Sequence, residues 1–318
     1  MDQAPLVAVT GGTGFLGQHA VAAFLAQGWR VRMLVRDGRR VPAAGAETVP
    51  GDLFDAAALR RLVEGAQAVV HLAGLTKARR ATDFMAVNRD GSARLAQAVA
   101  AAAPEARCVI LSSLAAREPG LSPYAASKRA GEEAAIAGLG PAGRWVVLRP
   151  TVIYGPGDRE GLVLRQLAGS ALVPAPRAPE PRITMVHARD VADALATLCV
   201  SGPLGEVFEV TDARYEGHGW RELLARIAGA LGNRPRFVGV PDVAMLAAGA
   251  AADALARVTG RGGIFGLGKA REILHRDWSS SPARQLPGLV WSPRITFEEG
   301  LQDTLAWWAS LGRGAARG

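Results

Sequence analysis

A tyrosine and a lysine that stand one helical turn apart, Tyr124 and Lys128, have the residue types and the spacing that acid–base chemistry needs. If this segment is helical, both side chains lie on the same face. An ammonium group near a phenol favours the phenolate and lowers the pKa of the phenol from about 10, so the tyrosine can exchange a proton near neutral pH. The pair therefore predicts proton transfer at a carbonyl or hydroxyl group.

Lysine at position 128 is itself informative, because only three of the 37 basic residues are lysines. An arginine would carry the same charge, but its wide planar fork does not offer the same compact point charge to a phenol and a ribose hydroxyl. The use of lysine here favours a chemical role.

Ser113 is the third candidate catalytic residue. The apolar run at residues 108–111 has the pattern of a buried parallel strand. Ser113 would then lie beyond the carboxyl end of that strand, where open α/β sheets bind their ligands. The alternative is a Ser-Ser turn followed by an ordinary surface helix.

Strand and helix patterns alternate through the first half of the chain. Strands are expected at residues 6–10, 30–35, 47–49, 67–72, 107–111 and 144–148, and helices at 14–27, 55–64, 83–103 and 124–138. Repeated units of this kind predict an α/β fold, a Rossmann doubly wound parallel sheet that helices cover on both faces.

The pattern loosens after Pro150. We expect residues 1–155 to form a dinucleotide-binding domain and residues 156–318 a smaller, mixed α/β substrate lobe, with the chain crossing back to the first domain. Residues 240–258 are very apolar, but charged residues interrupt them. This stretch is expected to line an apolar pocket or lie on a bilayer rather than to span one.

A glycine-rich turn follows the first strand pattern and opens the first helix pattern. Gly11, Gly14 and Gly17 would allow a tight turn, close approach of the backbone to a pyrophosphate, and close packing of helix on strand. The expected phosphate-side contacts of a dinucleotide are Gly11, Thr13, Gly14, Phe15, Leu16 and Gly17.

The end of the second strand favours NADP(H) over NAD(H). Arg36 comes first there, with Arg39 and Arg40 close behind, and an arginine at this place accommodates a 2′-phosphate. In the alternative interpretation, Asp37 binds the ribose and the cofactor is NAD(H).

Composition limits the other functions. The chain has 318 residues and a net charge of +8, but its arginines are scattered, so we expect no nucleic-acid partner and keep peripheral contact with a membrane surface as an alternative. Two cysteines and the lack of a signal-peptide pattern predict a cytoplasmic protein, with the inner face of a membrane as the alternative location. The five histidines are dispersed, so no metal site is expected.

Taken together, these residues resemble the extended short-chain dehydrogenase/reductase family, also called the NAD-dependent epimerase/dehydratase family. The resemblance covers the whole chain. Besides the glycine turn and the Tyr-x-x-x-Lys motif, it includes an adenine-contacting segment at 51–55, a nicotinamide-side strand end at 71–74, Asn88 in the central helix and a post-catalytic segment at 149–156.

The resemblance implies roles for single residues. Ser113 would polarise the substrate oxygen, Tyr124 would exchange the proton, and Lys128 would bind the nicotinamide ribose and lower the tyrosine pKa. Further cofactor contacts would be Asp52, Leu53, Ala73, Gly74, Pro150 and Val152. A homodimer with a four-helix interface is also implied.

Three functions remain open at this point. The first is reduction of a ketone on a hydrophobic substrate by NADPH; steroid-, flavonoid- and lipid-like ketones all fit, including a keto-sphingolipid or oxidised ceramide. It is favoured by Arg36 and by the loop between Ser113 and Tyr124, which is shorter than in typical sugar-nucleotide epimerases. The second is a nucleotide-sugar epimerase or dehydratase with tightly bound NAD, in which Arg182, Arg214 and Arg234 would hold a diphosphate. The third is a non-catalytic, nucleotide-binding assembly subunit.

Overall fold

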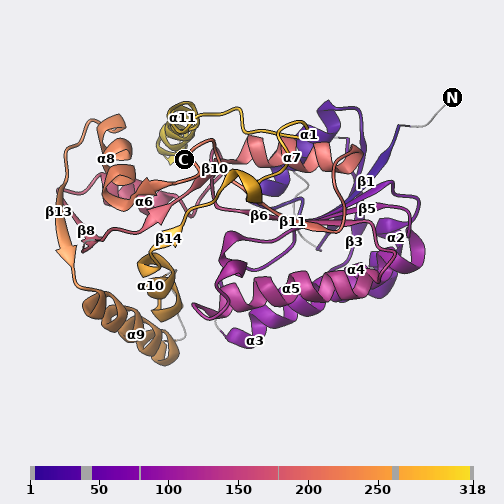
Figure 1. The fold of residues 1–318 in the computed structure, drawn as a ribbon, viewed down its shortest axis with the longest axis horizontal. Coiled ribbons are helices and arrows are strands. Elements are labelled where there is room, and N and C mark those ends of the chain that lie inside the picture. The colour runs from indigo at the N-terminus through magenta and orange to yellow at the C-terminus, as the bar shows by residue number, and fades with distance from the viewer. Residues whose placement is uncertain (1–3, 37–44, 79, 178, 260–264, 316–318) are drawn as a thin grey trace. The chain divides into compact units, whose positions relative to one another are not determined.

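A parallel sheet of seven strands carries the glycine-rich turn and the Tyr/Lys pair in the computed structural model of the chain (Figure 1). The structure describes residues 4–36, 45–78, 80–177, 179–259 and 265–315. The strand order is β11-β6-β5-β4-β1-β2-β3, and every neighbouring pair is parallel. The predicted fold class, a Rossmann-like α/β sheet, is confirmed.

Two compact units make up the chain. Unit 1 consists of residues 1–150, 189–210 and 286–292, and unit 2 of residues 151–188, 211–285 and 293–318. The sequence placed the division after residue 155; the units separate after Pro150, and the chain returns to unit 1 twice.

The elements of unit 1 follow the predicted alternation. Its strands are β1 (Leu6–Thr10), β2 (Arg30–Val35), β3 (Glu47–Pro50), β4 (Ala68–His71), β5 (Arg107–Leu111), β6 (Trp145–Pro150) and β11 (Glu206–Val210). Its helices are α1 (Phe15–Ala26), α2 (Ala56–Val63), α3 (Ala81–Phe84), α4 (Gly91–Ala102), α5 (Pro123–Leu139) and α7 (Ala188–Val200), with a 3-10 helix at Leu114–Arg117.

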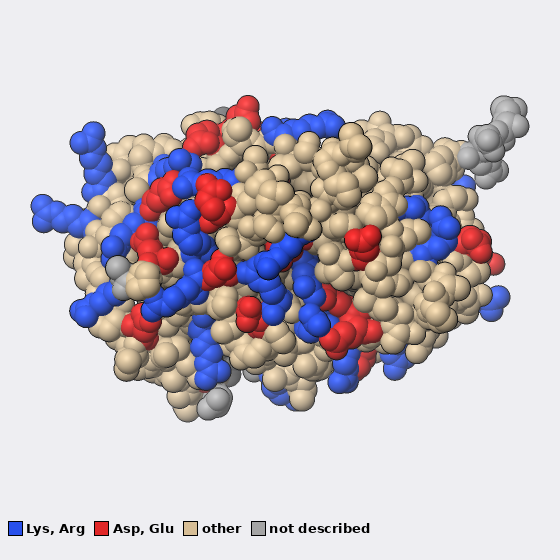
Figure 2. Space-filling view, in the orientation of Figure 1, with Lys and Arg blue, Asp and Glu red and all other residues tan. Residues whose placement is uncertain are grey.

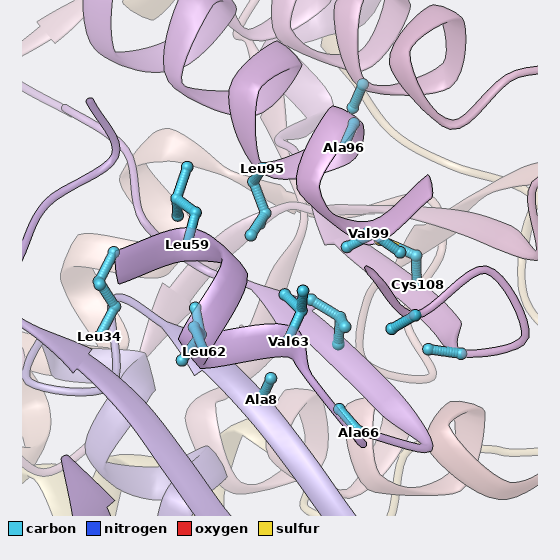
Figure 3. Close-up of a cluster of buried hydrophobic side chains, with 14 of the residues drawn as sticks. Ala8, Leu34, Leu59, Leu62, Val63, Ala66, Leu95, Ala96, Val99 and Cys108 are labelled. Carbon is cyan, nitrogen blue, oxygen red and sulfur yellow. The ribbon is translucent and has the colours of Figure 1, made fainter. Parts of the chain in front are cut away.

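Helices α2 and α4 cover one face of the sheet with apolar side chains. Leu59 and Leu62 of α2 and Leu95 and Val99 of α4 are buried against the strands (Figure 3). Buried residues fill both β1 and β4 along their whole length, as expected for strands with helices on both faces.

Two features of unit 1 differ from the expected elements. Strand β11 lies in the range 156–318 that the sequence analysis assigned to the lobe, but it is the edge strand of the central sheet, beside β6. The helix expected at 83–103 is continuous but not uniform, because a π-helical stretch at Met85–Asp90 separates α3 from α4. Such wide turns occur frequently at functional sites.

The described part of unit 2 contains two strand pairs (β10-β7 and β13-β8), a three-stranded sheet (β12-β9-β14) and five α-helices. The strands are β7 (Val152–Tyr154), β8 (Leu172–Pro176), β9 (Arg182–Ile183), β10 (Met185–His187), β12 (His218–Gly219), β13 (Arg236–Val240) and β14 (Asp277–Trp278). The helices are α6 (Leu162–Ala168), α8 (Trp220–Ala230), α9 (Asp242–Thr259), α10 (Leu267–Leu274) and α11 (Phe297–Ala315). Its core joins Tyr154 and Met185 with Leu223 of α8 and Trp308 of α11. Among the described helices, none has the length and apolar character needed to cross a membrane.

Candidate active site

The glycine-rich turn is in close backbone contact with α1 and with the segment that follows β4. Gly11 has a φ of +74°, and a β-carbon there would lie 2.6 Å from the backbone nitrogen of Ala73 at the end of β4. A β-carbon on Gly17 would overlap the carbonyl oxygen of Gly11. A side chain at Gly17 would therefore have to move α1 away from the turn, and a side chain at Gly11 would have to displace the backbone that follows β4.

The N-terminus of α1 fits an anion such as a pyrophosphate. The helix follows Gly14, and no described side chain caps it. The first N–H groups of a helix have no partner within the helix, and the helix dipole favours negative charge there. Thr13 lies in the turn, and Phe15 and Leu16 are the first residues of α1, so the residues present suit a dinucleotide.

The carboxyl ends of β2 and β3 carry the expected adenosine-side residues. Arg36 directly follows β2 and is exposed. Asp52 accepts a hydrogen bond from the N–H of Phe54 (2.8 Å) through one carboxylate oxygen, and Leu53 is buried next to Gly91. Arg39 and Arg40, named above for the 2′-phosphate, and Asp37, named for the ribose of NAD(H), lie outside the described residues.

Helix α5 holds the Tyr/Lys pair near its beginning. The Ser122 hydroxyl caps the helix by accepting a hydrogen bond from the Ala125 N–H (3.0 Å). Lys128 Nζ donates to the carbonyl oxygen of Leu111, the last residue of β5, at 2.8 Å. Burial lowers the pKa of Lys128 to about 8, and the carboxylate of Glu132 opposes this shift.

Ser113 lies just beyond β5, as expected from the sequence. Its Oγ accepts a hydrogen bond from the Ala115 N–H (3.2 Å) and caps the 3-10 helix, which leaves its hydroxyl proton for another acceptor. The neighbouring Ser112 is buried, and no hydrogen-bond partner of its hydroxyl lies among the described residues. Ser113 and the ammonium of Lys128 therefore both lie at the carboxyl end of β5.

Asn88, in the π-helical stretch, supports the catalytic helix. Its amide oxygen accepts from the Leu75 N–H (2.7 Å), and its amide nitrogen donates to the Leu75 carbonyl (3.0 Å) and to Ser127 Oγ (2.8 Å). Ser127 in turn donates to the carbonyl oxygen of Tyr124 (2.7 Å). Asn88 therefore ties the segment after β4 to the turn of α5 that carries the tyrosine.

A buried histidine that we did not predict as a site residue extends this network to β1. His71 Nδ1 lies 2.7 Å from Thr10 Oγ1, and its Nε2 lies 2.9 Å from Ser92 Oγ. Ser92 donates its proton to the Asn88 carbonyl (2.6 Å), so its oxygen must accept from the histidine. This direction assigns the Nε2–H tautomer to His71, with Thr10 donating to Nδ1.

The charge state of His71 agrees with that direction. Burial, with a smaller contribution from the charge of Lys128, lowers the pKa of His71 to about 3. The imidazole is therefore neutral at neutral pH, with one N–H donor and one acceptor nitrogen, as the chain from Thr10 to Asn88 requires.

Glu132 is a further residue that the sequence analysis missed. Its carboxylate accepts two hydrogen bonds from Arg149 of β6 (2.8 and 2.6 Å), and both side chains are largely buried. It lies one turn after Lys128, so the i, i+4 spacing was a usable signal. The ion pair fixes α5 against β6.

The remaining predicted cofactor residues are placed as follows. The N–H of Ala73 donates to Thr10 Oγ1 (3.3 Å), and a β-carbon on Gly74 would lie 3.1 Å from the Asn88 amide oxygen. Pro150 is the last residue of β6. Val152 belongs to unit 2, on β7, and its contact with a cofactor stays a prediction.

Comparison with known proteins decides the family. A family model described as the NAD dependent epimerase/dehydratase family matches residues 7–211. The chain belongs to this family. Two relatives from curated proteins align over nearly all of it: the ceramide reductase of Caulobacter vibrioides, 43% identical over 98% of this chain and 96% of its own, and a ketoreductase of Stigmatella aurantiaca named for 4-hydroxy-2-methyl-3-oxo-4-farnesyl-3,4-dihydroquinoline-1-oxide, 28% identical over 96% of this chain and 97% of its own.

A solved structure shows the same fold at greater distance. The dTDP-glucose 4,6-dehydratase of Bacillus anthracis, solved in complex with NAD, aligns with a TM-score of 0.72 at 19% identity, over 96% of this chain and 97% of its own. The family and its reductase relatives establish the chain as an NAD(P)-dependent oxidoreductase.

Proposed function

We propose that this enzyme reduces a ketone on a hydrophobic, lipid-like substrate with NADPH. The observation that carries the proposal is the 43% identity to a ceramide reductase across almost the full length of both chains. A second relative named as a ketoreductase of a farnesylated quinoline also supports an apolar ketone. A keto-sphingolipid or an oxidised ceramide is the substrate class we infer.

In this reaction the carbonyl carbon gains a hydride and the carbonyl oxygen gains a proton, which yields a secondary alcohol. NADPH, which the glycine-rich turn at residues 11–17 and Arg36 would hold, would supply the hydride and leave as NADP⁺. The Ser113 hydroxyl donates a hydrogen bond to the carbonyl oxygen, and the Tyr124 phenol delivers the proton to that oxygen as negative charge develops on it. Lys128 stabilises the phenolate that remains until solvent reprotonates it.

The preference for NADP(H) rests on Arg36. Its guanidinium follows β2 and is exposed, where it can pair with a 2′-phosphate. Steady-state kinetics with both cofactors tests this: we expect a KM at least ten-fold lower for NADPH than for NADH. A lower KM for NADH would overturn the cofactor assignment but leave the reductase assignment intact.

The decisive experiment measures NADPH oxidation with a panel of ketones: long-chain keto-sphingolipids, oxidised ceramide, steroids and flavonoids. We expect turnover on the lipid ketones, and a fall of at least a hundred-fold in Tyr124→Phe, which removes only the hydroxyl. Turnover confined to steroid or flavonoid ketones would replace the substrate class. No ketone turned over, with tightly held NAD in the purified protein, would favour the epimerase alternative.

Two of the three arginines considered for a sugar nucleotide, Arg182 and Arg214, do not favour that alternative, whereas Arg234 is exposed. Arg182 donates to the backbone carbonyls of Glu216 (2.9 Å) and Gly217 (3.0 Å). Arg214 forms a bidentate pair with Glu222 (2.5 and 3.0 Å). Both guanidinium groups are thus bound within unit 2, which reduces what they can offer to a diphosphate.

A further inference from the structure

Helix α9 of unit 2 exposes an apolar surface that the catalytic residues do not use. Three of its large side chains are among the most exposed apolar groups: Val243 (77%), Leu255 (63%) and Val258 (86%). Phe265, just before α10, is exposed as well. The exposed described residues of α9 are Val243, Ala244, Ala247, Ala248, Ala250, Ala251, Ala254, Leu255, Val258 and Thr259.

The opposite side of α9 packs against the beginning of α10, so the apolar face described above is the side of α9 that points away from α10. A β-carbon on Gly249 would lie 2.9 Å from the carbonyl oxygen of Gly266, so the two segments touch through their backbones. Asp253 accepts a hydrogen bond from the N–H of Leu267, the first residue of α10 (3.0 Å). Asp242 lies 3.7 Å from Arg276. Both acidic groups of α9 are thus engaged inside unit 2.

Basic residues flank this apolar face. Arg234 and Arg236 are exposed shortly before α9, and Lys269 and Arg271 are exposed in α10. Residues 234–271 contain six Lys or Arg and two Asp. In Figure 2, tan side chains form much of the edge at the lower left, where Figure 1 draws α9, with blue side chains on both sides and a red group nearby.

We propose that the exposed face of α9, together with Phe265, rests on an anionic lipid bilayer. One face of α9 is apolar, its half-exposed acid Asp242 lies beside Arg276, and basic residues lie before and after the helix, a pattern that suits a helix lying on an anionic surface. Each Lys or Arg near an anionic surface adds about 1 kcal/mol of attraction. A lasting protein interface usually contains Trp, Tyr or Arg at its centre, whereas this face consists mainly of alanine.

The inference rests on the proposed function, because a lipid ketone resides in the bilayer and must be taken from it. Contact through α9 would hold the enzyme at the surface where its substrate is concentrated. The position of the enzyme on the bilayer would then favour membrane-resident ketones over water-soluble ones.

Vesicle flotation of the full-length protein tests the inference without any turnover. The probes are vesicles of phosphatidylethanolamine with phosphatidylglycerol and, for comparison, vesicles of phosphatidylcholine alone. We expect binding to the anionic vesicles and a fall of at least ten-fold in the partition coefficient for the double variant Leu255→Glu/Val258→Glu. The matched control, Val200→Glu/Leu289→Glu, makes the same charge change at exposed positions of unit 1 (67% and 104%) and should bind within about two-fold of the unaltered protein after allowance for charge.

Three results would overturn the inference: no binding of the unaltered protein, an equal loss in the control variant, or a size-exclusion shift from a larger to a smaller species in the α9 variant alone. The last result would mean that a second copy covers this face. Circular dichroism and NADPH binding establish that both variants are folded. Vesicle binding without reduction of any ketone would contradict the proposed function but not the membrane-contacting surface. Reduction of a detergent-solubilised lipid ketone without vesicle binding would contradict the membrane-contacting surface but not the proposed function.

Discussion

At the scale of single residues, the proposed chemistry depends on the protonation states of two groups, the buried His71 and the half-buried Lys128. The imidazole of His71 must stay neutral to keep its hydrogen bonds in a single direction, and the mechanism we propose requires a charged Lys128 ammonium to favour the phenolate of Tyr124. Both pKa values are lowered, mainly by burial, and each shift has a consequence that can be measured.

His71 should make the protein less stable in acid. The unfolded chain protonates this imidazole near pH 6.5, but the folded protein does so only near 3, so a falling pH favours unfolding between these values. Between pH 6.5 and 4.5, His71 should lower the free energy of unfolding by about 2 to 3 kcal/mol at most, since one pKa unit corresponds to about 1.4 kcal/mol. We would measure the free energy of unfolding in urea at pH 6.5 and at pH 4.5. In His71→Gln, its decrease between the two pH values should be smaller than in the unaltered protein by that amount. The control His275→Gln should keep the full drop, and the same drop in both variants would contradict the assignment.

Lys128 should titrate near pH 8 in cofactor-free enzyme. Because the chain has only three lysines, ¹³Cε-labelled lysine gives three NMR signals, and Lys128→Arg identifies the relevant one. Glu132→Gln should lower this pKa further, since the carboxylate favours the ammonium, and the rate of reduction should then decline from a lower pH. Glu133→Gln, at a neighbouring exposed position, is the control. A Lys128 signal that titrates near 10 would contradict this account.

At the scale of elements, the cofactor turn depends on how closely α1 approaches it. Gly17→Ala directs a β-carbon at the carbonyl oxygen of Gly11, and backbone cannot yield as a flexible side chain could. We expect the Kd for NADPH to rise at least ten-fold, measured by fluorescence titration. Gly229→Ala is the matched change in α8, where a β-carbon meets nothing within 4 Å. It should leave the Kd unchanged and raise Tm slightly, since alanine is the better helix former by about 0.5–1 kcal/mol. Equal Kd values in the two variants would refute the packing argument.

At the scale of the whole molecule, unit 1 is completed by distant segments. Helix α7 buries Val191, Leu195 and Leu198, and Arg107 at the start of β5 donates to the carbonyls of Leu198 (2.7 Å), Ser201 (2.8 Å) and Gly202 (2.9 Å) at the end of that helix. A fragment of residues 1–155 lacks α7 and β11, so it should show no cooperative thermal transition and should bind a hydrophobic dye. Cooperative unfolding of this fragment, followed by circular dichroism, would show that the later segments are dispensable.

The sequence was sufficient for the features that are local. Periodicity located the strands and helices of residues 5–150, and the spacing of Tyr124 and Lys128 located the candidate catalytic pair. The sequence did not reveal the hydrogen bonds that link Thr10, His71 and Ser92. These partners lie 61 and 21 residues apart and meet only when the sheet forms. For the same reason, β11 was expected in the lobe: its apolar pattern identifies a strand but not its neighbour. The π-helical stretch leaves no signal in helical periodicity over so few residues.

The discontinuity of unit 1 also bears on how the protein is made. A ribosome must synthesise the chain as far as residue 292 before the last segment of unit 1 exists. Until β11 emerges, β6 is an open sheet edge with unpaired amide and carbonyl groups, which invites association with other nascent chains. We therefore expect production in cells to benefit from chaperones that shield such intermediates, more than a protein with sequentially completed domains would.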